Sequence, residues 1–553
     1  MRQLFVVLLI SLFALSFACR RTNSEFVTVA LPEKFTTFDT LTTTASDSAA
    51  ERIRSIIFNT LVRKDEHFNY VGELAKDIKI SEDGKTVTFT LRDNVKFHNG
   101  KEFTSADVKY TFDELFKANG YKAGAFYDTE PLPESTTPKS SPAAAPANSN
   151  ASSSPKSEAT PQTQRVAQIS SIVTPDPQTV VFTVTKPALA NQLLSNLVAV
   201  PIVAEGTIDQ LKERPIGTGP YKFVNFDSSQ NIVELAANPD YWEGAPKVAK
   251  LRIKTVTDAN SLQAELQTGG VDIAPNPSNL PPDSIKALGA NPNLKVEQTD
   301  GSNIQYLVFN VAPTVLDKPN ALSNVKVRQA IGYAIDRQKI VSDLLFNQAT
   351  VADSTVPPQS WAFTPGTQYK YDPAKSKQLL QEAGYKGEPI VFKYSSGNAL
   401  VNQYGQVIQN YLNDVGFNVQ IETLEVNTIR DQLKNGQYQM YTGVWIGGNQ
   451  DPIFLRDLFD TSKITGGSVS CCNRSRYSNQ QVDGLVENAI DVTATDRDKA
   501  KQLFGQTWQI VSDELPLLPL WYPANIVIAN KRIGNIKISP SGDYSFVKDI
   551  TLQ

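Results

Sequence analysis

The stretch that decides the fold is YDPAKSKQLLQEAGYKGEPIVFKYSSGNALVNQYGQVIQNYLNDVGFNVQI, residues 371–421. Asp372 and Pro373, as N-cap and first-turn residue, predict a helix that ends at Gly384. An apolar strand follows, and then a helix whose buried face comprises Val401, Tyr404, Ile408, Tyr411, Leu412 and Val415. Residues 417–421 alternate as a further strand. This succession of helices and strands predicts an α/β domain.

Two similar hairpins are predicted nearer the N-terminus. Residues 80–91 pass through a Ser-Glu-Asp-Gly turn into an alternating strand, and residues 173–184 match them at a constant offset. A true internal repeat and two uses of one turn chemistry both explain the match. Between the hairpins, residues 129–164 are mainly Pro, Ser, Ala, Thr, Asn and Lys, with Leu132 as their one large apolar residue. Such a segment cannot bury enough surface to offset its ordering entropy, so we expect a disordered insert within one domain.

The N-terminus has the layout of a secretion signal. Arg2 precedes an apolar run that ends at Ala18, and Cys19 follows directly. We expect residues 1–19 to be a signal peptide with a lipobox, Cys19 to be acylated, and residues 20–25 to be a polar tether. Simple signal cleavage, with Cys19 either lost or left as a free thiol, is the alternative. Since no other segment has the roughly 18 uninterrupted apolar residues of a membrane span, the mature chain is expected to be exported and anchored at most by lipid.

Composition argues against several classes of function. The 553 residues have a net charge of −4, so a nucleic-acid partner is not expected. There are two histidines, His67 and His98, and three cysteines, which leaves little material for metal sites or nucleophilic triads. The chain has no GxSxG elbow, HExxH helix or P-loop, so we expect no enzyme activity, no cofactor and no metal site.

A series of short motifs gives the chain a family resemblance. It resembles the extracellular solute-binding protein family 5, the peptide and nickel receptors of ABC importers. The motifs cover nearly the whole mature chain and occur in the family's order. They are Asp83-Gly84, Thr88–Arg92, Val95–Gly100, Ser105–Val108, Gly217–Tyr221, Asn238–Gly244, Val327–Ile331, Ala334–Arg337, Tyr371–Pro373, Glu382–Tyr385 and Arg476–Asn479.

The resemblance implies a periplasmic-binding-protein-like α/β fold with two lobes, a hinge and an extra domain in the N-terminal half. We expect lobe I to comprise residues 26–50, about 190–256 and 524–553. The extra domain is expected at 51–189 and lobe II at about 257–523. In such receptors the lobes close over a ligand by hinge motion, because the ligand contacts both lobes only in the closed state.

The function implied is capture of peptides or peptide-like solutes outside the cytoplasmic membrane and delivery to an ABC permease, by a monomeric receptor. A receptor for another solute, such as a metal chelate, glutathione or a sugar, is the first alternative. A secreted hydrolase built from distant Ser, His and Asp residues is the second. A structural or adhesive lipoprotein that uses the insert is the third.

The loop around Trp445 is the principal candidate for the ligand site. In similar peptide receptors this loop lines the cleft, and an Asp within it pairs with the ligand's α-amino group. The aligned position here is Gly448, and Asp451 is the candidate substitute, with a turn at Asp-Pro as the other interpretation. The substrate-binding residues expected are Trp445, Ile446, Gly447, Gly448, Asn449, Asp451, Phe38, Trp361 and Tyr394, of which the last three serve equally well as core residues.

The adjacent Cys471 and Cys472 are unusual. In an oxidising compartment they predict a disulfide, whereas two free thiols there would be reactive. No other cluster of ligands accompanies them, so a metal site at this pair is not expected.

Overall fold

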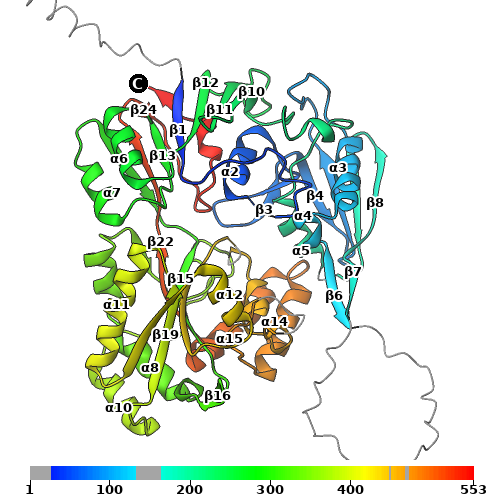
Figure 1. The fold of residues 1–553 in the computed structure, drawn as a ribbon. Coiled ribbons are helices and arrows are strands. Elements are labelled where there is room, and N and C mark those ends of the chain that lie inside the picture. Colours follow the sequence, from blue (N-terminus) through cyan, green and yellow to red (C-terminus); the bar gives the residue numbers. More distant parts are fainter. Residues whose placement is uncertain (1–25, 46, 132–162, 188, 448–449, 467–471) are drawn as a thin grey trace, which may run out of the picture.

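The computed structural model describes residues 26–45, 47–131, 163–187, 189–447, 450–466 and 472–553. Figure 1 shows two lobes, one above the other, each built around its own β-sheet. The predicted α/β fold class is confirmed. The expected signal peptide, lipobox and tether lie outside the described residues, as do Cys19, Cys471, Gly448 and Asn449.

The first lobe is a seven-stranded mixed sheet in the order β10-β11-β12-β1-β13-β23-β14. Its central strand β1 is buried at every position because α2 packs on one face of the sheet and α6 and α7 pack on the other (Figure 1). The elements are β1 (Val27–Leu31), β10 (Tyr221–Asp227), β11 (Ile232–Ala237), β12 (Lys250–Thr255), β13 (Ile273–Pro275), β14 (Leu294–Thr299), β23 (Asn525–Asn530), α2 (Ser48–Ile57), α6 (Ala259–Thr268) and α7 (Pro282–Gly289).

The boundary between the lobes differs from the one expected. Strands β13 and β14 belong to the first lobe's sheet, so residues 257–299 lie in lobe I, although the sequence assigned them to lobe II. Helix–strand units have the same hydrophobic pattern in both lobes. The pattern therefore reveals the unit but not the sheet that it joins.

The second lobe is a six-stranded sheet in the order β18-β22-β15-β21-β19-β20, with helices on both faces. Along β15, Leu307 and Phe309 enter one core cluster, and Tyr306 and Val308 enter the other. The strands are β15 (Ile304–Phe309), β18 (Ala349–Val351), β19 (Pro389–Ser395), β20 (Asn418–Leu424), β21 (Met440–Trp445) and β22 (Leu517–Pro523). The helices are α8 (Val325–Ala334), α10 (Pro373–Ala383), α11 (Ala399–Asp414), α12 (Val426–Lys434), α13 (Phe454–Phe459), α14 (Gln480–Val492) and α15 (Arg497–Glu514).

The decisive stretch folds as predicted. Asp372 caps α10 by accepting a hydrogen bond from the Lys375 amide, Pro373 opens the helix, and Gly384 closes it at φ 68°. Strand β19, helix α11 and strand β20 then follow in the expected order, and β20 lies parallel to β19.

The two predicted hairpins meet in one four-stranded sheet, β4-β5-β9-β8. The equivalent strands β5 (Thr86–Leu91) and β9 (Thr179–Val184) pair antiparallel at the centre, flanked by β4 (Ala75–Ile80) and β8 (Ile169–Asp176). The equivalent residues Phe89 and Phe182 meet edge to face, with ring centroids 5.6 Å apart. The sheet is therefore arranged as two matching halves. The extra domain also contains the helices α3 (Ser105–Ala118), α4 (Tyr121–Gly124) and α5 (Leu189–Leu197), which share a hydrophobic core with this sheet.

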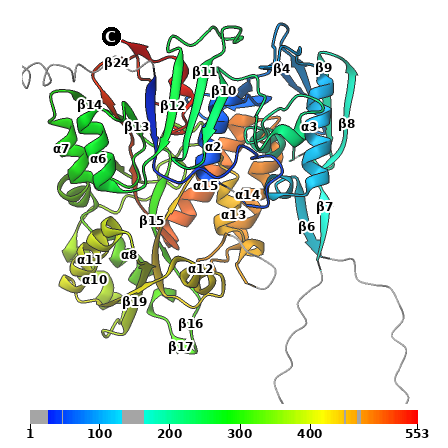
Figure 2. The ribbon, with the colours of Figure 1, turned by 45° about the horizontal axis from the view of Figure 1, so that its top comes forward.

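The predicted insert begins and ends on a two-stranded ladder. The strands β6 (Tyr127–Pro131) and β7 (Thr163–Ala167) pair antiparallel, so the ends of the expected disordered segment have strand backbone. Residues 132–162 lie outside the described residues. Figures 1 and 2 both place β6 and β7 at the far end of the molecule from α6 and α7.

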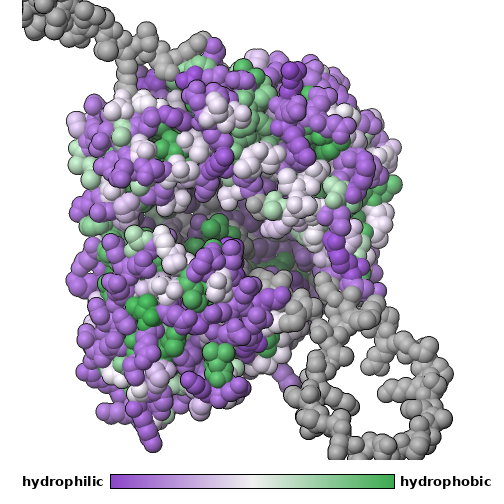
Figure 3. Space-filling model, viewed as in Figure 1, coloured by the Kyte–Doolittle hydropathy of each residue, from purple (hydrophilic) through white to green (hydrophobic). Residues whose placement is uncertain are grey.

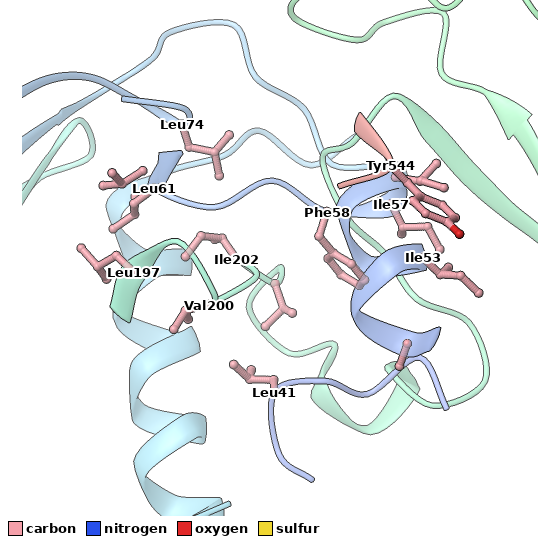
Figure 4. Close-up of a cluster of buried hydrophobic side chains, with 14 of the residues drawn as sticks. Leu41, Ile53, Ile57, Phe58, Leu61, Leu74, Leu197, Val200, Ile202 and Tyr544 are labelled. Atoms are coloured by element: carbon pink, nitrogen blue, oxygen red, sulfur yellow. The ribbon is translucent and has the colours of Figure 1, made fainter. Parts of the chain in front are cut away.

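The extra domain and the first lobe share one hydrophobic core. Figure 4 shows where they meet: Ile53 and Ile57 of α2 lie beside Tyr544, and Phe58 at the end of the helix lies between them and the group of Ile202, Val200, Leu197, Leu61 and Leu74. The second lobe has separate core clusters of its own. We therefore treat the first lobe with the extra domain as one body and the second lobe as another.

Two crossover connections join these bodies. One runs from β14 to β15 and the other from β22 to β23, and they pass beside each other at Gly301 and Pro523. A Cβ on Gly301 would overlap the carbonyl oxygen of Pro523, so only glycine permits this approach. In the described part of the chain, no helix has the length and apolar character needed to cross a membrane.

Candidate functional site

A cavity of about 690 Å³ lies at the junction of the two bodies. On the first-lobe side it is lined by the end of α2, the strand β2 (Val62–Lys64), Thr299 at the end of β14 and the segment 537–548, and on the other side by Gln450. Figure 3 shows this face of the molecule hollowed between the upper and lower lobes, with apolar groups in the depth of the hollow. A volume of this size suits a small organic solute.

Most charges in the cavity wall are balanced within the first lobe. The Arg63 guanidinium forms a 2.8 Å ion pair with Glu243. The Glu73 carboxylate accepts hydrogen bonds from the Thr60 amide and from Asn59 Nδ2, each at 2.7 Å. Burial nevertheless raises the pKa of Glu73. These groups fix the end of α2 against the strands that follow it.

Three of the side-chain contacts that cross from the first body to the second share one origin. They come from the hairpin of β2 and β3 (Tyr70–Gly72), in which Lys64 and Tyr70 are cross-strand partners. Lys64 Nζ donates to Gln450 Oε1 at 2.9 Å, and the Tyr70 hydroxyl donates to Asp451 Oδ2. At the start of α15, Arg497 donates to Asn69 Oδ1. The hairpin is thus held against the second lobe by polar side chains.

The pKa values of the hairpin's side chains reflect this confinement. Burial lowers the pKa of Lys64, and the nearby Asp451 carboxylate opposes that effect. Burial, and then the charge of Asp451, raise the pKa of Tyr70 well above its ordinary value. The Tyr70 hydroxyl therefore remains a proton donor toward Asp451 at neutral pH.

Asp451 is committed to the protein in this structure. Oδ1 accepts from the Ile453 amide at 3.0 Å in the turn before α13, and Oδ2 accepts from Tyr70. The residue is 8% exposed. Its carboxylate joins the hairpin to the second lobe, which is a different task from the ionic ligand contact predicted for it.

Trp445 stands at the end of β21 and is fixed by aromatic neighbours. Its ring lies nearly parallel to Tyr306 at 6.2 Å, meets Phe454 edge-on at 4.8 Å, and has the Arg474 guanidinium 5.5 Å from its centroid. Ile446 follows with 73% exposure, and Gly447 has a φ of 74°. The loop therefore leaves a rigid base and turns outward.

The remaining candidates divide between the rim and the core. Trp361 is half-buried, with the Arg497 guanidinium 4.3 Å from its ring centroid, so it lies at the rim where the bodies touch. Phe38 is 4% exposed and packs against Phe35, Phe223 and Phe226. Tyr394 is 2% exposed and meets Phe392 edge-on. The structure places Phe38 and Tyr394 in the hydrophobic core rather than at the cavity, because their rings complete apolar clusters within a single lobe.

Neither histidine lines the cavity. His98 Nε2 lies 3.0 Å from the Gly219 carbonyl oxygen, and its Nδ1 accepts from the Gly217 amide at 3.3 Å. Burial lowers the pKa of His98 to about 4, so the ring is neutral at pH 7. Cys472 takes part in a disulfide. The described residues contain no group of three or more His, Cys, Asp or Glu side chains placed to hold a metal ion.

Sequence reasoning missed Lys64, Tyr70 and Gln450, which join the hairpin to the second body. The turn between β2 and β3 was the available signal, because strand pairing brings Lys64 and Tyr70 together. Nothing in the local pattern indicates that residues some 380 positions away face this hairpin.

Comparisons with known proteins agree with this architecture. The family model "Bacterial extracellular solute-binding proteins, family 5 Middle" matches residues 69–467. Heme-binding protein A of Haemophilus influenzae is 28% identical, covering 89% of this chain and 86% of its own. The dipeptide-binding protein of Escherichia coli is 27% identical, with coverages of 89% and 88%.

Solved structures show the same fold. The substrate-binding protein CtaP of Listeria monocytogenes superposes with a TM-score of 0.76 at 20% identity, over 95% of this chain and 99% of that one. NikZ of Campylobacter jejuni, in complex with Ni(L-His), superposes with a TM-score of 0.70 at 22% identity and the same coverages. The chain belongs to family 5 of the bacterial extracellular solute-binding proteins.

Proposed function

We propose that this chain captures peptides or peptide-like solutes outside the cytoplasmic membrane and delivers them to an ABC permease. The observation that carries the proposal is the cavity between two bodies joined by paired crossovers in a family 5 receptor. A ligand that contacts both bodies favours the closed arrangement, and the closed form is then distinguishable by a membrane partner.

Relatives with peptide cargo support the choice of ligand. They include the di/tripeptide-binding protein 1 of Pseudomonas aeruginosa, 27% identical over 95% of this chain, and the dipeptide-binding protein of Escherichia coli. A cavity of about 690 Å³ has room for a short peptide.

A non-peptide solute is the second candidate. The carboxylate of Asp451, a candidate substitute for the family's amino-binding aspartate, is bonded to Tyr70 and to the Ile453 amide. Other relatives are a heme-binding protein and the glutathione-binding protein GsiB of Salmonella typhimurium. A metal chelate, glutathione or a sugar would need no such carboxylate.

The protein acts, in this proposal, without catalysis and as a monomer. Neither histidine lines the cavity, which supports the absence of His-dependent hydrolysis. Cys19 is proposed to carry the lipid that holds the receptor at the membrane. Detergent phase partitioning of the wild type and Cys19→Ser tests the anchor, since only the wild type should enter the detergent phase.

A thermal-shift screen of the purified protein tests the cargo. Peptide, metal-chelate, glutathione and sugar libraries are compared, and the proposal expects the largest rise in melting temperature with short peptides. If only non-peptide compounds raise the melting temperature, the peptide assignment fails while the receptor role stands. Turnover of any of these compounds would contradict both.

A further inference from the structure

Lys64 is a lysine at the junction of the two bodies. Its side chain is half-buried, lines the cavity and donates to Gln450 Oε1 at 2.9 Å. Its ammonium also lies 6.0 Å from the ring centroid of Phe68 and 5.8 Å from that of Tyr70. The group is thus confined by aromatic rings on one side and by a neutral amide on the other.

The charges of the other cations in the cavity wall are balanced by carboxylates or solvated by water. Arg63 pairs with Glu243 at 2.8 Å, Arg54 with Glu51 at 2.7 Å, and Lys548 with Asp549 at 2.9 Å. Lys537 is exposed, so water solvates it. Within the described part of the chain, Lys64 has no ion-pair partner among the carboxylates.

The Asp451 carboxylate acts on Lys64 through its charge, but the two side chains form no direct ion pair within the described residues. The Asp451 oxygens accept instead from the Tyr70 hydroxyl and the Ile453 amide. An ammonium has three N–H donors, and withdrawing it from water without a charged acceptor is unfavourable. The cavity side of Lys64 is therefore suited to an anion.

Gln450 fixes the direction of the lysine. Its Nε2 donates to Ser302 Oγ at 2.8 Å, which turns its Oε1 toward Lys64. The amide orients the ammonium but contributes no charge, whereas a glutamate at this position would pair with it.

We infer that Lys64 anchors an anionic group, a carboxylate or similar oxyanion, of the captured solute, and that Gln450 positions Lys64 for this contact. The inference rests on the proposed function and narrows its substrate class. The favoured solute presents an anionic group to the hairpin of β2 and β3. It need not present a free ammonium to the loop around Trp445, as the ligands of similar peptide receptors do.

Four probes test the inference by titration calorimetry on the purified protein. They are N-acetyl-trialanine, its C-terminal amide, trialanine amide with a free amino group, and glutathione, whose carboxylates belong to a different kind of solute. The wild type should bind N-acetyl-trialanine or glutathione about 10- to 100-fold more tightly than the two amides. Tighter binding of trialanine amide would overturn the inference.

Substitutions at Lys64 distinguish a lysine that binds the solute's anionic group from one that only stabilises the protein. Lys64→Met should lose the preference for acids over amides, and Lys64→Arg should retain it. The matched control Lys79→Met removes an exposed lysine of β4 that does not line the cavity, and it should change nothing. A structural role for Lys64 would instead weaken acids and amides equally, and that result would contradict the anchor.

Gln450→Glu provides a second route that leaves Lys64 in place. The new carboxylate should pair with the ammonium and weaken acid binding about 10-fold while amide binding stays unchanged. Unaltered acid binding in this variant would count against the anchor. If none of the four probes binds, the peptide-type cargo fails. Mass spectrometry of the solute that co-purifies with the protein then tests the role of Lys64. An uncharged or cationic solute would overturn the inference that Lys64 anchors an anion.

Discussion

The two bodies meet at the crossovers and at the cavity, and different kinds of contact join them at these two places. Beside the crossovers the contact is made largely by backbone groups: Gly301 passes directly beside the Pro523 carbonyl, and the Ala524 amide donates to the Gln348 carbonyl at 3.0 Å. The Gln348 side chain adds a hydrogen bond to the Pro282 carbonyl at 2.8 Å. On the cavity side the contact is made by the ends of polar side chains, Lys64 on Gln450 and Tyr70 on Asp451.

This difference indicates which side opens. Backbone packing without room for a Cβ holds the two strands in fixed register, whereas side-chain hydrogen bonds at a polar junction exchange readily with water. We infer that the bodies rotate about the crossovers and separate at the hairpin of β2 and β3. Substitutions on the two sides should therefore act differently.

The largest effect is expected at the crossovers. Gly301→Ala places a Cβ against the Pro523 carbonyl and should lower the free energy of unfolding by about 3 kcal/mol, because neither backbone segment has space to yield. Chemical denaturation measures this. Gly484→Ala, a helix position with open space around its Cβ, is the control and should not destabilise the protein. Equal stability of the two variants would contradict a tightly packed crossover.

A pH effect of intermediate size should arise at His98, which is outside the hairpin of β2 and β3. The folded-state pKa of about 4 lies below the ordinary value of 6.5, so between these values the unfolded chain binds the additional proton. Stability attributable to His98 is therefore full above pH 6.5 and falls as the pH decreases toward 4. The loss from pH 7 to pH 5 should be about 2 kcal/mol.

Thermal unfolding at these two pH values, compared between the wild type and His98→Gln, measures the contribution of His98. The variant should show a smaller decline, since its amide does not titrate. An identical decline in both proteins would show that His98 is already protonated or is not confined.

A smaller effect is expected on the cavity side. Tyr70→Phe removes the hydrogen bond to Asp451 and should cost about 1 kcal/mol, while amide hydrogen exchange over residues 62–72 becomes faster. Tyr371→Phe, at a tyrosine that is 45% exposed, is the control. Unchanged exchange in the hairpin would mean that Tyr70 does not hold the two bodies together.

The smallest effect is expected at the outer edge of the same side. Arg497 is exposed, and Arg497→Met removes its bond to Asn69 and its contact with the Trp361 ring. The loss should be about 0.5 kcal/mol in the midpoint of chemical denaturation and should shrink in high salt. A loss comparable to that of Gly301→Ala would remove the distinction between the two sides.

Much of the fold could be predicted because local chemistry specifies it. The Asp372-Pro373 start and the Gly384 end of α10 require only the preceding and following few residues. The two hairpins could be located from turn residues and alternation, but their pairing through β5 and β9 could not, because strand order depends on contacts distant in sequence. The same limit explains the misplaced boundary at residues 257–299.

The site was less predictable than the fold. Trp445 and Asp451 could be located by resemblance, yet the commitment of Asp451 to Tyr70 depends on how two separately folded bodies meet. Phe38 and Tyr394 are aromatic residues for which the sequence pattern is the same in a core and at a ligand. Lys64 and Gln450 are ordinary polar residues until the two bodies are assembled.

Small-angle X-ray scattering of the purified protein, before and after its cargo is removed, tests the clamp most directly. The account predicts that the cargo-free protein has a larger radius of gyration and that adding the cargo back restores the smaller value. If the radius of gyration is the same with and without cargo, although the added cargo is shown to bind, the result would contradict a receptor that closes around its solute.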